Sequence, residues 1–334
     1  MTPEAALDRV VHLLDRAHET TFKPKAFQRA RNVVREMDPA ELAERAAAGT
    51  LTKLAGIGDA SARVITEALA GEVPAYLAKL EATTHVPISP EGQRYREGLK
   101  GDCHVHSMWS DGGAEIEEMA VTARALGHQY MVLTDHSPRL TIANGLSRER
   151  LERQLVDIAA LNEIMAPFRI LTGMEVDILE DGSLDLDNDL LTRLDVVVAS
   201  VHSKLRMPQR QMTERMVRAV ASPHVDILGH CTGRLIGRRP QSTFDADYVF
   251  AACEQFGTAV EINCRPERLD PPRELIDVAI AYDCWFSIDT DAHATGQLEW
   301  HPYGCDRAAE RQVPIDRIIN TLSADDLLAW TANG

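Results

Sequence analysis

Residues 101–112, GDCHVHSMWSDG, join the start of a β-rich run to a cluster of polar side chains at its end. Asp102, His104 and His106 alternate along this run, and alternate residues of a strand point to the same face. Helical patterns lie between this run and later ones, at 114–126, 147–165, 210–221, 244–256 and 273–283. Six more β-rich runs end near Asp135, Asp177, His202, His230, Asn263 and His293. Seven βα repeats over roughly 220 residues predict an α/β fold with a parallel barrel rather than an open sheet.

The predicted strand ends carry imidazole and carboxylate side chains. Enzyme sites on parallel barrels lie at this carboxyl rim, and these two ligand types suit Zn, Mn or Fe without a thiolate. A single strand-end histidine is most often a satisfied polar residue, but packing gives no reason to gather six of the twelve histidines at one rim. We therefore expect a site for more than one metal ion. The residues at these ends are His104, His106, Asp111, Asp135, His136, Glu175, Asp177, His202, His230, Asp291 and His293.

Charge is distributed unevenly over the 334 residues, which carry 35 Lys+Arg, 51 Asp+Glu and a net charge of −16. Residues 1–100 hold 14 basic and 14 acidic residues, so the whole surplus lies in the later segment, as a solvated acidic surface or as carboxylates that hold cations. No apolar run approaches the ~20 residues of a membrane span, and the N-terminus lacks a signal-peptide core. We expect a cytoplasmic protein that makes no membrane contact, with its six cysteines as free thiols.

The N-terminal region is expected to be helical and to bind the phosphate backbone of DNA. Its segment Thr20–Arg35 has five basic residues and no acid, which could also be an ordinary solvated helix face. LTKLAGIGDASARVITEAL, at 51–69, resembles the helix-hairpin-helix element, whose glycine turn lets backbone amides approach a phosphate. A plain helix turn is the alternative. The expected DNA contacts are Gly56, Gly58, Lys23, Lys25, Arg29, Arg31 and Arg35. Residues 82–99 lose periodicity and predict a linker between domains 1–81 and 100–334.

The motifs HxHSxxSDG, TDH, GxExD, SVHS, GH and DAH together resemble the polymerase and histidinol phosphatase (PHP) family of metal phosphoesterases. This resemblance implies a distorted (β/α)7 TIM-like barrel over 100–334 that binds two or three divalent ions, Mn, Zn or Fe. Asp102 and Asp135 fit roles beside the ligands, where they would orient neighbouring imidazoles. The metal ligands that the resemblance implies are His104, His106, Asp111, His136, Glu175, His202, His230, Asp291 and His293.

The segments 212–239 and 261–270 are most similar to the C-terminal PHP domain of bacterial family X DNA polymerases, in which a helix-hairpin-helix also precedes the barrel. The short linker leaves no room for palm and fingers domains, so no polymerase activity is expected. The lysine that deoxyribose-phosphate lyases carry on the second hairpin helix aligns with Val64. A lyase reaction by that residue is therefore not expected.

The function expected from the sequence is hydrolysis of DNA phosphodiesters with bound metal ions. A 3′→5′ exonuclease in DNA repair, with abasic-site endonuclease or 3′-phosphatase activity, is the leading hypothesis. Phosphate contacts are expected from Arg234, Arg268, Lys204 and Arg265, for each of which a surface salt bridge is the alternative. Two other hypotheses remain open: a small-molecule phosphatase of the histidinol-phosphate type, and a catalytically silent PHP module that serves as a DNA-binding scaffold.

Overall fold

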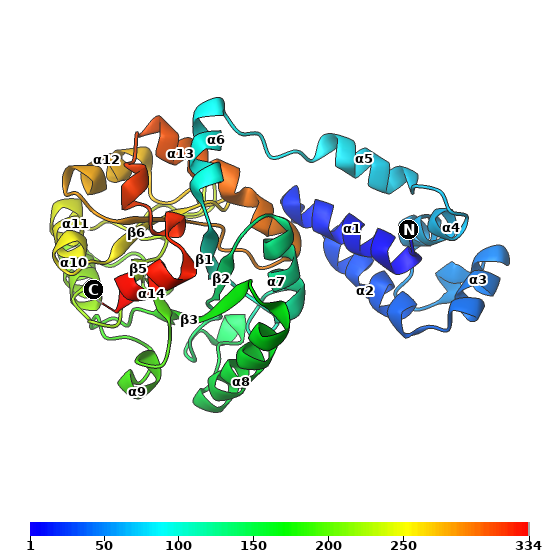
Figure 1. Cartoon of the computed structure of the whole chain (residues 1–334), viewed down its shortest axis with the longest axis horizontal. Coiled ribbons are helices and arrows are strands. Elements are labelled where there is room, and N and C mark those ends of the chain that lie inside the picture. The colour runs from blue at the N-terminus through cyan, green and yellow to red at the C-terminus, as the bar shows by residue number, and fades with distance from the viewer. Residues whose placement is uncertain (333–334) are drawn as a thin grey trace. The chain divides into compact units, whose positions relative to one another are not determined.

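The computed structural model describes residues 1–332, which divide into two compact units (Figure 1). One unit comprises residues 1–86 with 295–297, and the other comprises residues 87–294 and those from 298 onward. The division falls inside the predicted linker. Within residues 1–332, no helix combines the length and the apolar character that crossing a membrane requires.

The first unit is built from helices around a small apolar core. Leu7, Val10 and Leu13 of the first helix are fully buried, and they pack with Phe27 and Ile65 of later helices. The start of the first helix is capped by Thr2, whose side chain accepts a hydrogen bond from the amide of Ala5. The elements are α1 (Pro3–Arg16), α2 (Lys23–Glu36), α3 (Pro39–Ala47), the 3-10 turn η1 (Leu51–Lys53), α4 (Asp59–Leu69) and α5 (Ala75–Thr83).

The glycine turn at 56–58 packs closely on α2. Gly56 has φ +96°, and a Cβ placed there would lie 3.2 Å from Val33 Cγ2 and 3.8 Å from Arg29 Cβ. A left-handed backbone and a close approach both favour glycine at this position. Gly58 precedes α4, and its amide donates to Ser61 Oγ at 3.0 Å. The turn is therefore rigidly held beside Arg29, although the segment before it forms one 3-10 turn rather than a full helix.

The second unit contains a seven-stranded parallel sheet in the order β1 to β7, which curls into a nearly closed barrel. The edges approach each other through a bridge between Val105 and Ala292, where the His106 amide donates to the Ala292 carbonyl at 2.8 Å. The α/β barrel predicted from the sequence is confirmed. The strands are β1 (Gly101–Val105), β2 (Tyr130–Leu133), β3 (Arg169–Asp177), β4 (Val196–Ser200), β5 (Ile227–Leu228), β6 (Ala259–Asn263) and β7 (Phe286–Asp289).

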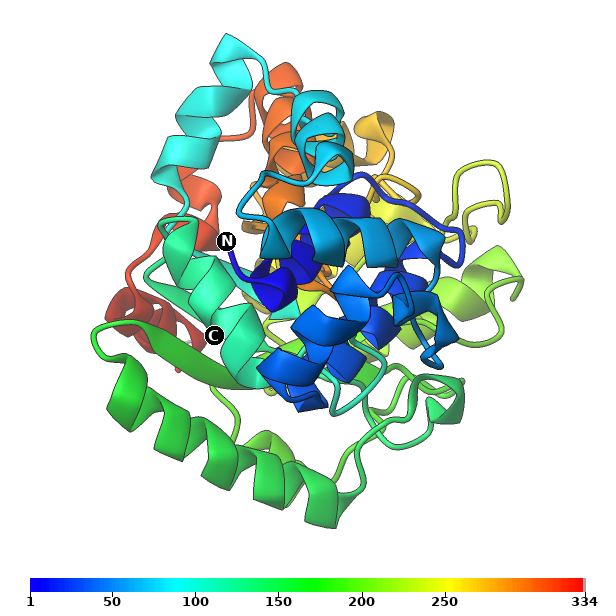
Figure 2. The same cartoon turned by 90° about the vertical axis from the view of Figure 1, so that its right-hand side faces the viewer.

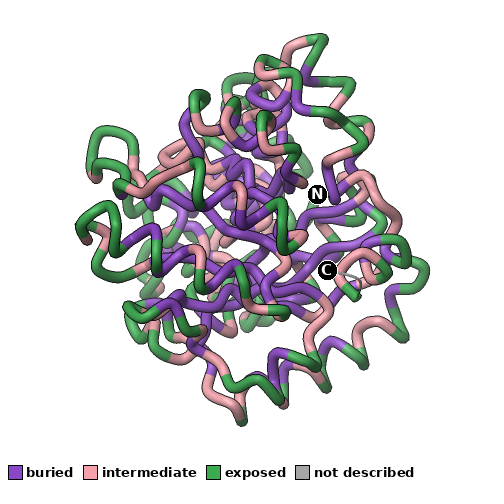
Figure 3. Tube along the Cα trace, turned by 90° about the vertical axis from the view of Figure 1, so that its left-hand side faces the viewer, coloured by how far each residue is buried: buried purple, intermediate pink, exposed green. Residues whose placement is uncertain are grey.

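Helices surround the strands, which form the buried centre of this unit (Figure 3). All five residues of β4 are buried, as expected for a parallel strand covered on both faces. The long helix α8 runs along the outside (Figure 2). The helices are α6 (Pro90–Gly98), α7 (Ile116–Ala125), α8 (Arg148–Met165), α9 (Asn188–Leu191), α10 (Gln209–Val220), α11 (Ala246–Gln255), α12 (Arg273–Ala281), α13 (His301–Glu310) and α14 (Ala324–Thr331), with 3-10 turns η2 (Thr141–Ala143), η3 (Thr295–Trp300), η4 (Ile315–Arg317) and η5 (Ile319–Thr321).

The prediction of a linker over residues 82–99 is wrong for its second half, where α6 packs on the barrel. Pro90 occupies the first turn of α6, where its missing amide costs nothing, and the Ser89 side chain caps the helix at the amide of Gly92. Asp306 of α13 accepts hydrogen bonds from the Ser89 amide and hydroxyl at 2.9 and 2.7 Å. Proline and glycine therefore mark a helix start here rather than an unstructured connection.

Candidate metal centre

The carboxyl ends of the strands bring the nine implied ligands together. His104 lies in β1, Glu175 lies in β3, and the other histidines and aspartates follow strand ends or lie in the loop after β1. Their donor atoms form four groups in which all atoms lie within 4.8 Å of one another. The groups are His106–Asp111–His136–His293, His104–His106–Asp291, His104–Glu175–His230 and His136–Glu175–His202.

Glu175 lies at the centre of this arrangement. Its Oε1 atom is 2.8 Å from His230 Nε2 and 3.2 Å from His202 Nε2. Its Oε2 atom is 2.9 Å from His136 Nδ1 and 3.3 Å from His104 Nε2. His106 Nε2 lies 3.5 Å from Oε2 as well, so one carboxylate faces five imidazoles. It belongs to two of the four groups and could therefore serve two cation sites.

Many donor atoms of the cluster are buried without a hydrogen-bond partner. They include both Glu175 oxygens, both ring nitrogens of His106 and of His202, and His104 Nε2. An unsatisfied buried polar atom costs about 1–3 kcal/mol, so proteins seldom concentrate several at one place. Cations bound by these atoms would account for them, and nitrogen with carboxylate oxygen fits Zn, Mn or Fe. The donor set therefore fits a site for several divalent ions.

Some side chains of the cluster have the protonation state that binds cations, and others do not. Burial lowers the pKa of His202, but Glu175 and Asp177 outweigh it and raise that pKa to about 9, so this imidazole would lose a proton on binding a cation. Burial lowers the pKa of His230 to about 4, with a further contribution from Arg268, and this imidazole is neutral near pH 7. Burial likewise holds the pKa of His106 well below its usual range. Burial opposes ionisation of Glu175, but the surrounding imidazoles, His202 first, outweigh it and hold its pKa well below the usual value. A neutral imidazole and an ionised carboxylate are the forms that bind metals.

Asp102 and Asp135 are buried beside the cluster, but neither contacts the imidazole of an implied ligand. Asp135 accepts hydrogen bonds from the Ser107 amide at 2.8 Å and from the hydroxyls of Ser107 and Ser110. Asp102 accepts from the Thr290 hydroxyl and from the backbone amide of His104, at 3.1 Å for the latter. The prediction that these carboxylates orient imidazoles is therefore replaced by a role in fixing the backbone of the ligand-bearing loops.

A carboxylate that does hold an imidazole is Glu261 of β6, which the sequence pattern did not single out. Its Oε1 atom lies 2.6 Å from His104 Nδ1, and both side chains are fully buried. The sequence signal was an acidic residue in the middle of an otherwise apolar strand, AVEIN. Such a residue on a strand buried on both faces requires a polar partner.

The four residues expected to contact phosphate differ in whether their charged groups already have protein partners. Arg268 lies on the cluster, with Nε 3.3 Å from Asp291 Oδ2, and its Nε and Nη1 atoms are buried without a hydrogen-bond partner. Arg265 is occupied by Glu267 at 2.8 Å and by the Asp291 carbonyl at 2.9 Å. Among these residues, Arg268 is therefore the best placed to bind an additional anion.

Arg234 and Lys204 lie differently from the prediction. Arg234 donates from Nε to the carbonyl of Arg268 at 2.8 Å and also to the carbonyl of Leu269, so it braces the loop that carries Arg268. Lys204 is exposed, with Nζ 3.7 Å from a carboxylate oxygen of Glu180. Neither contact places a free cationic group on the cluster.

Three of the five basic residues of the segment Thr20–Arg35 form ion pairs within the first unit. Lys23 pairs with Glu19 at 3.0 Å, Arg31 with Asp8 at 3.2 Å and Arg35 with Glu4 at 2.6 Å. Three of the five basic residues expected to contact DNA therefore have an acidic partner, supplied to one side of α2 by α1 and the loop after it. Lys25 and Arg29 are exposed and have no ionic partner among residues 1–332.

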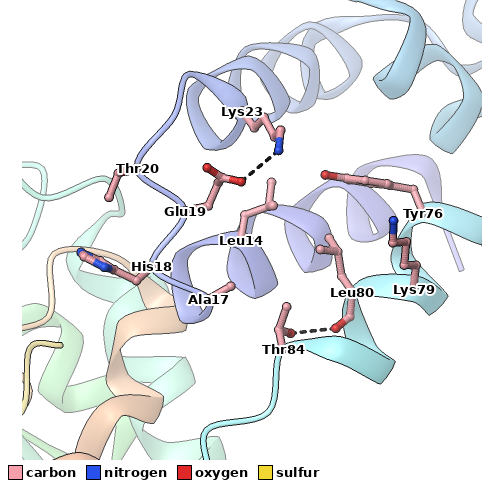
Figure 4. A pocket seen from close by; sticks show the side chains of 10 residues that line it. All are labelled: Leu14, Ala17, His18, Glu19, Thr20, Lys23, Tyr76, Lys79, Leu80 and Thr84. Atoms are coloured by element: carbon pink, nitrogen blue, oxygen red, sulfur yellow. Dashed lines mark hydrogen bonds and ion pairs between the residues drawn. The ribbon is translucent and has the colours of Figure 1, made fainter.

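A groove in this unit lies beside the Lys23–Glu19 pair. It has a volume of about 400 Å³ and is lined by the end of α1, the following loop and α5, with Tyr76 and Lys79 on one wall (Figure 4). Glu19 extends to Lys23 across its edge, as the dashed line in Figure 4 marks. The charge of Lys23 is thereby neutralised within the groove.

Comparisons with known proteins place the barrel in a family. The PHP domain model matches residues 102–265. The chain is 42% identical over 232 residues to the DNA polymerase/3′-5′ exonuclease PolX of Bacillus subtilis strain 168, which covers 70% of this chain and 41% of that protein. It is 33% identical over 168 residues to a probable phosphatase of Thermoanaerobacter sp. strain X514, which covers 48% of this chain and 63% of that protein. The chain thus spans less than two thirds of either relative.

A crystal structure with a similar fold is that of histidinol phosphate phosphatase from Lactococcus lactis, complexed with zinc, L-histidinol and phosphate. It is 17% identical with a TM-score of 0.45, and the match covers 63% of this chain and 94% of that chain. The domain match contains seven of the nine residues gathered at the strand ends, and the other two, Asp291 and His293, follow it. Residues 102–265 of this chain form a PHP domain.

Proposed function

We propose that this chain is a metal-dependent phosphoesterase that hydrolyses phosphodiesters of DNA. The observation that carries the reaction class is the group of nine imidazole and carboxylate side chains, many of whose donor atoms are buried without a hydrogen-bond partner. Divalent ions held by these residues would supply Lewis-acid activation of water and of the phosphate. His104, His106, Glu175, His230 and their neighbours would hold those ions.

Arg268 supplies the second part of the proposed chemistry. Its Nε atom lies beside Asp291 at the cluster, and its Nη1 atom is buried without a hydrogen-bond partner, so a phosphate oxygen could take the position beside Nη1 that no protein acceptor fills. A guanidinium there would orient the phosphate and stabilise the negative charge that increases during hydrolysis. Arg234 would hold the Arg268 loop in that position through its two carbonyl contacts.

DNA is the proposed substrate, with 3′→5′ exonuclease as the leading activity and abasic-site endonuclease or 3′-phosphatase as accompanying ones. Identity of 42% to a protein named DNA polymerase/3′-5′ exonuclease supports this substrate, while the polymerase activity of that name is not proposed here. The first unit adds a second line of support. Arg29 is exposed, and its Cβ lies 3.8 Å from where a Cβ on Gly56 would be, so this arginine lies beside the glycine turn. Backbone amides and an arginine at one place suit a phosphate of the DNA backbone.

A small-molecule phosphatase is the second candidate. The 33% identity to a probable phosphatase favours it, because that match spans 48% of this chain. This candidate explains the metal cluster and Arg268 but gives no role to the glycine turn and Arg29. A silent scaffold, the third hypothesis, would not require so many buried donor atoms to lack hydrogen-bond partners.

One parallel assay separates these candidates. Purified protein with Mn²⁺ is given 3′-labelled duplex, single-stranded DNA, abasic duplex and histidinol phosphate. We expect shortening of DNA from its 3′ end, loss of that activity in His104→Ala, and DNA binding by His104→Ala that equals the wild type. Hydrolysis of histidinol phosphate alone would replace the proposal with the second candidate. Bound metal without turnover of any substrate would support the scaffold.

A further inference from the structure

Glu261 connects three parts of the metal centre although it is not one of its ligands. Its Oε1 atom lies 2.6 Å from His104 Nδ1 of β1. Its Oε2 atom accepts from the His230 backbone amide at 2.5 Å and from Asn263 Nδ2 at 3.2 Å. Asn263 Nδ2 lies 3.2 Å from Asp291 Oδ2 as well. This fully buried carboxylate therefore connects His104 directly with the backbone of His230, and reaches Asp291 through Asn263.

These contacts fix the proton on the His104 ring. Both Glu261 oxygens accept hydrogen bonds, so the hydrogen between Glu261 Oε1 and His104 Nδ1 must be bonded to Nδ1. The neutral ring then has a lone pair on Nε2, which is the atom 3.3 Å from Glu175 and 3.9 Å from Asp291. That same Nε2 atom has no hydrogen-bond partner. The tautomer set by Glu261 is the one that directs a ligand atom into the cluster.

We propose that Glu261 is a positioning residue for cation binding, acting through the tautomer and orientation of His104 and through the backbone of His230. The proposal rests on the metal-binding part of the proposed function and is independent of the substrate. Carboxylates that hold ligating histidines in this way change metal affinity by about 10–100-fold when they are removed.

Glutamine is an informative replacement because it has the size of glutamate but only one acceptor oxygen. If the amide nitrogen of Glu261→Gln faces His104, the ring must accept at Nδ1, and its hydrogen moves to Nε2, where it blocks a cation. If the amide nitrogen faces the other way, it meets the amide of His230 and the Asn263 donor. A residue that merely fills the core would instead tolerate this change, since glutamine removes a buried charge.

Two measurements test the proposal on full-length protein. Nitrogen-15 spectra of histidine-labelled, metal-free protein, recorded at rising pH until the rings are neutral, report the tautomer of each ring, with His104 assigned by its loss in His104→Ala. Competition with a chromophoric chelator reports the affinity for Zn²⁺. We expect an Nδ1–H ring at His104 in the wild type, a changed ring signature in Glu261→Gln, and Zn²⁺ affinity lower by about 10–100-fold in that variant.

A matched control and a second variant keep the outcomes distinct. Asp226→Asn neutralises another buried carboxyl group, which precedes β5 and accepts from the Val197 amide, and its Zn²⁺ affinity should equal the wild type. Glu261→Asp keeps both acceptor oxygens and should bind Zn²⁺ better than Glu261→Gln; it also serves if the glutamine variant fails to fold. Wild-type affinity in Glu261→Gln, or aspartate weaker than glutamine, would overturn the proposal. Absence of phosphoesterase activity in the wild type would refute the proposed function and leave these measurements unaffected.

Discussion

Glu175 Oε1 lies 2.8 Å from His230 Nε2, although β3 and the end of β5 are separated by more than one helix and strand along the chain. The other oxygen of the same carboxylate is turned toward His136 and His104. Two ligand groups therefore share one side chain, and the loss of that side chain affects both. A single carboxylate therefore connects these two ligand groups.

Replacing Glu175 with glutamine should reduce both metal content and hydrolysis. Glutamine keeps the size of the side chain but removes the negative charge that the neighbouring imidazoles and cations face. We expect at least one metal ion fewer per chain by mass spectrometry and turnover lower by about 10²–10³-fold. Glu180→Gln is the control, because Glu180 is exposed and belongs to none of the four ligand groups. Full metal occupancy in Glu175→Gln would contradict a shared ligand.

Arg268 should affect hydrolysis without affecting metal content. Replacement by alanine removes Nη1, which has no protein acceptor, and we expect kcat/KM lower by about 10²-fold with unchanged metal stoichiometry. Arg268→Lys should recover only part of this loss, because lysine lacks the planar pair of donors. Arg273→Ala, which removes an exposed arginine paired with Glu310 at 2.5 Å, should behave as the wild type. Equal losses in Arg268→Ala and Arg273→Ala would argue against a phosphate contact.

The barrel and its rim of ligands were predictable from the sequence because both depend on local pattern. Apolar runs end in His or Asp residues, and parallel strands bring such ends to one edge. His104 and His106 lie two residues apart on one strand, so their common face follows from the strand period. The nine side chains that the motifs single out are the same nine that meet in space.

Contacts between distant elements were not predictable in the same way. Glu261 meets His104 across 157 residues of sequence, and nothing within AVEIN indicates which strand its side chain faces. The partners of Arg31 and Arg35 lie on α1, so the apparent stripe of cations on α2 is partly neutralised only once the two helices pack. The helix over Pro90–Gly98 was missed because a proline in a first helical turn resembles a break in the sequence.

The difference between paired and unpaired cations on α2 predicts how DNA binding depends on salt. Replacing Lys25 and Arg29 with glutamine removes two exposed cations that have no ionic partner among the described residues. We expect weaker DNA binding and a slope of log affinity against log salt that is shallower by about 2, since each phosphate contact contributes about 1. Fluorescence anisotropy over a range of salt concentrations measures both quantities.

Lys23→Gln with Arg35→Gln is the matched control for this experiment. It removes the same number of positive charges, but both residues are already paired with acids, at 3.0 and 2.6 Å. We expect the salt slope of this control to stay near that of the wild type. An equal change in both double variants would mean that net charge alone, rather than contacts at Lys25 and Arg29, sets DNA affinity.

Asp226 predicts a dependence of stability on pH that is separate from the metal centre. Burial raises its pKa to about 7, and only the hydrogen bond from the Val197 amide, at 2.7 Å, opposes that shift. Between about pH 4 and pH 7 the unfolded chain has lost this proton while the folded protein keeps it, so stability decreases as the pH rises through this range. Above pH 7 both states are ionised and the loss is constant.

Asp226→Asn removes the ionisation and keeps an acceptor for Val197. As the pH rises from 5 to 8, we expect the free energy of unfolding of this variant to increase by about 2 kcal/mol relative to that of the wild type, with most of the increase below pH 7. Urea unfolding of chelator-treated protein measures this difference. A difference between the two proteins that stays constant over this range would show that Asp226 ionises alike in the folded and unfolded states.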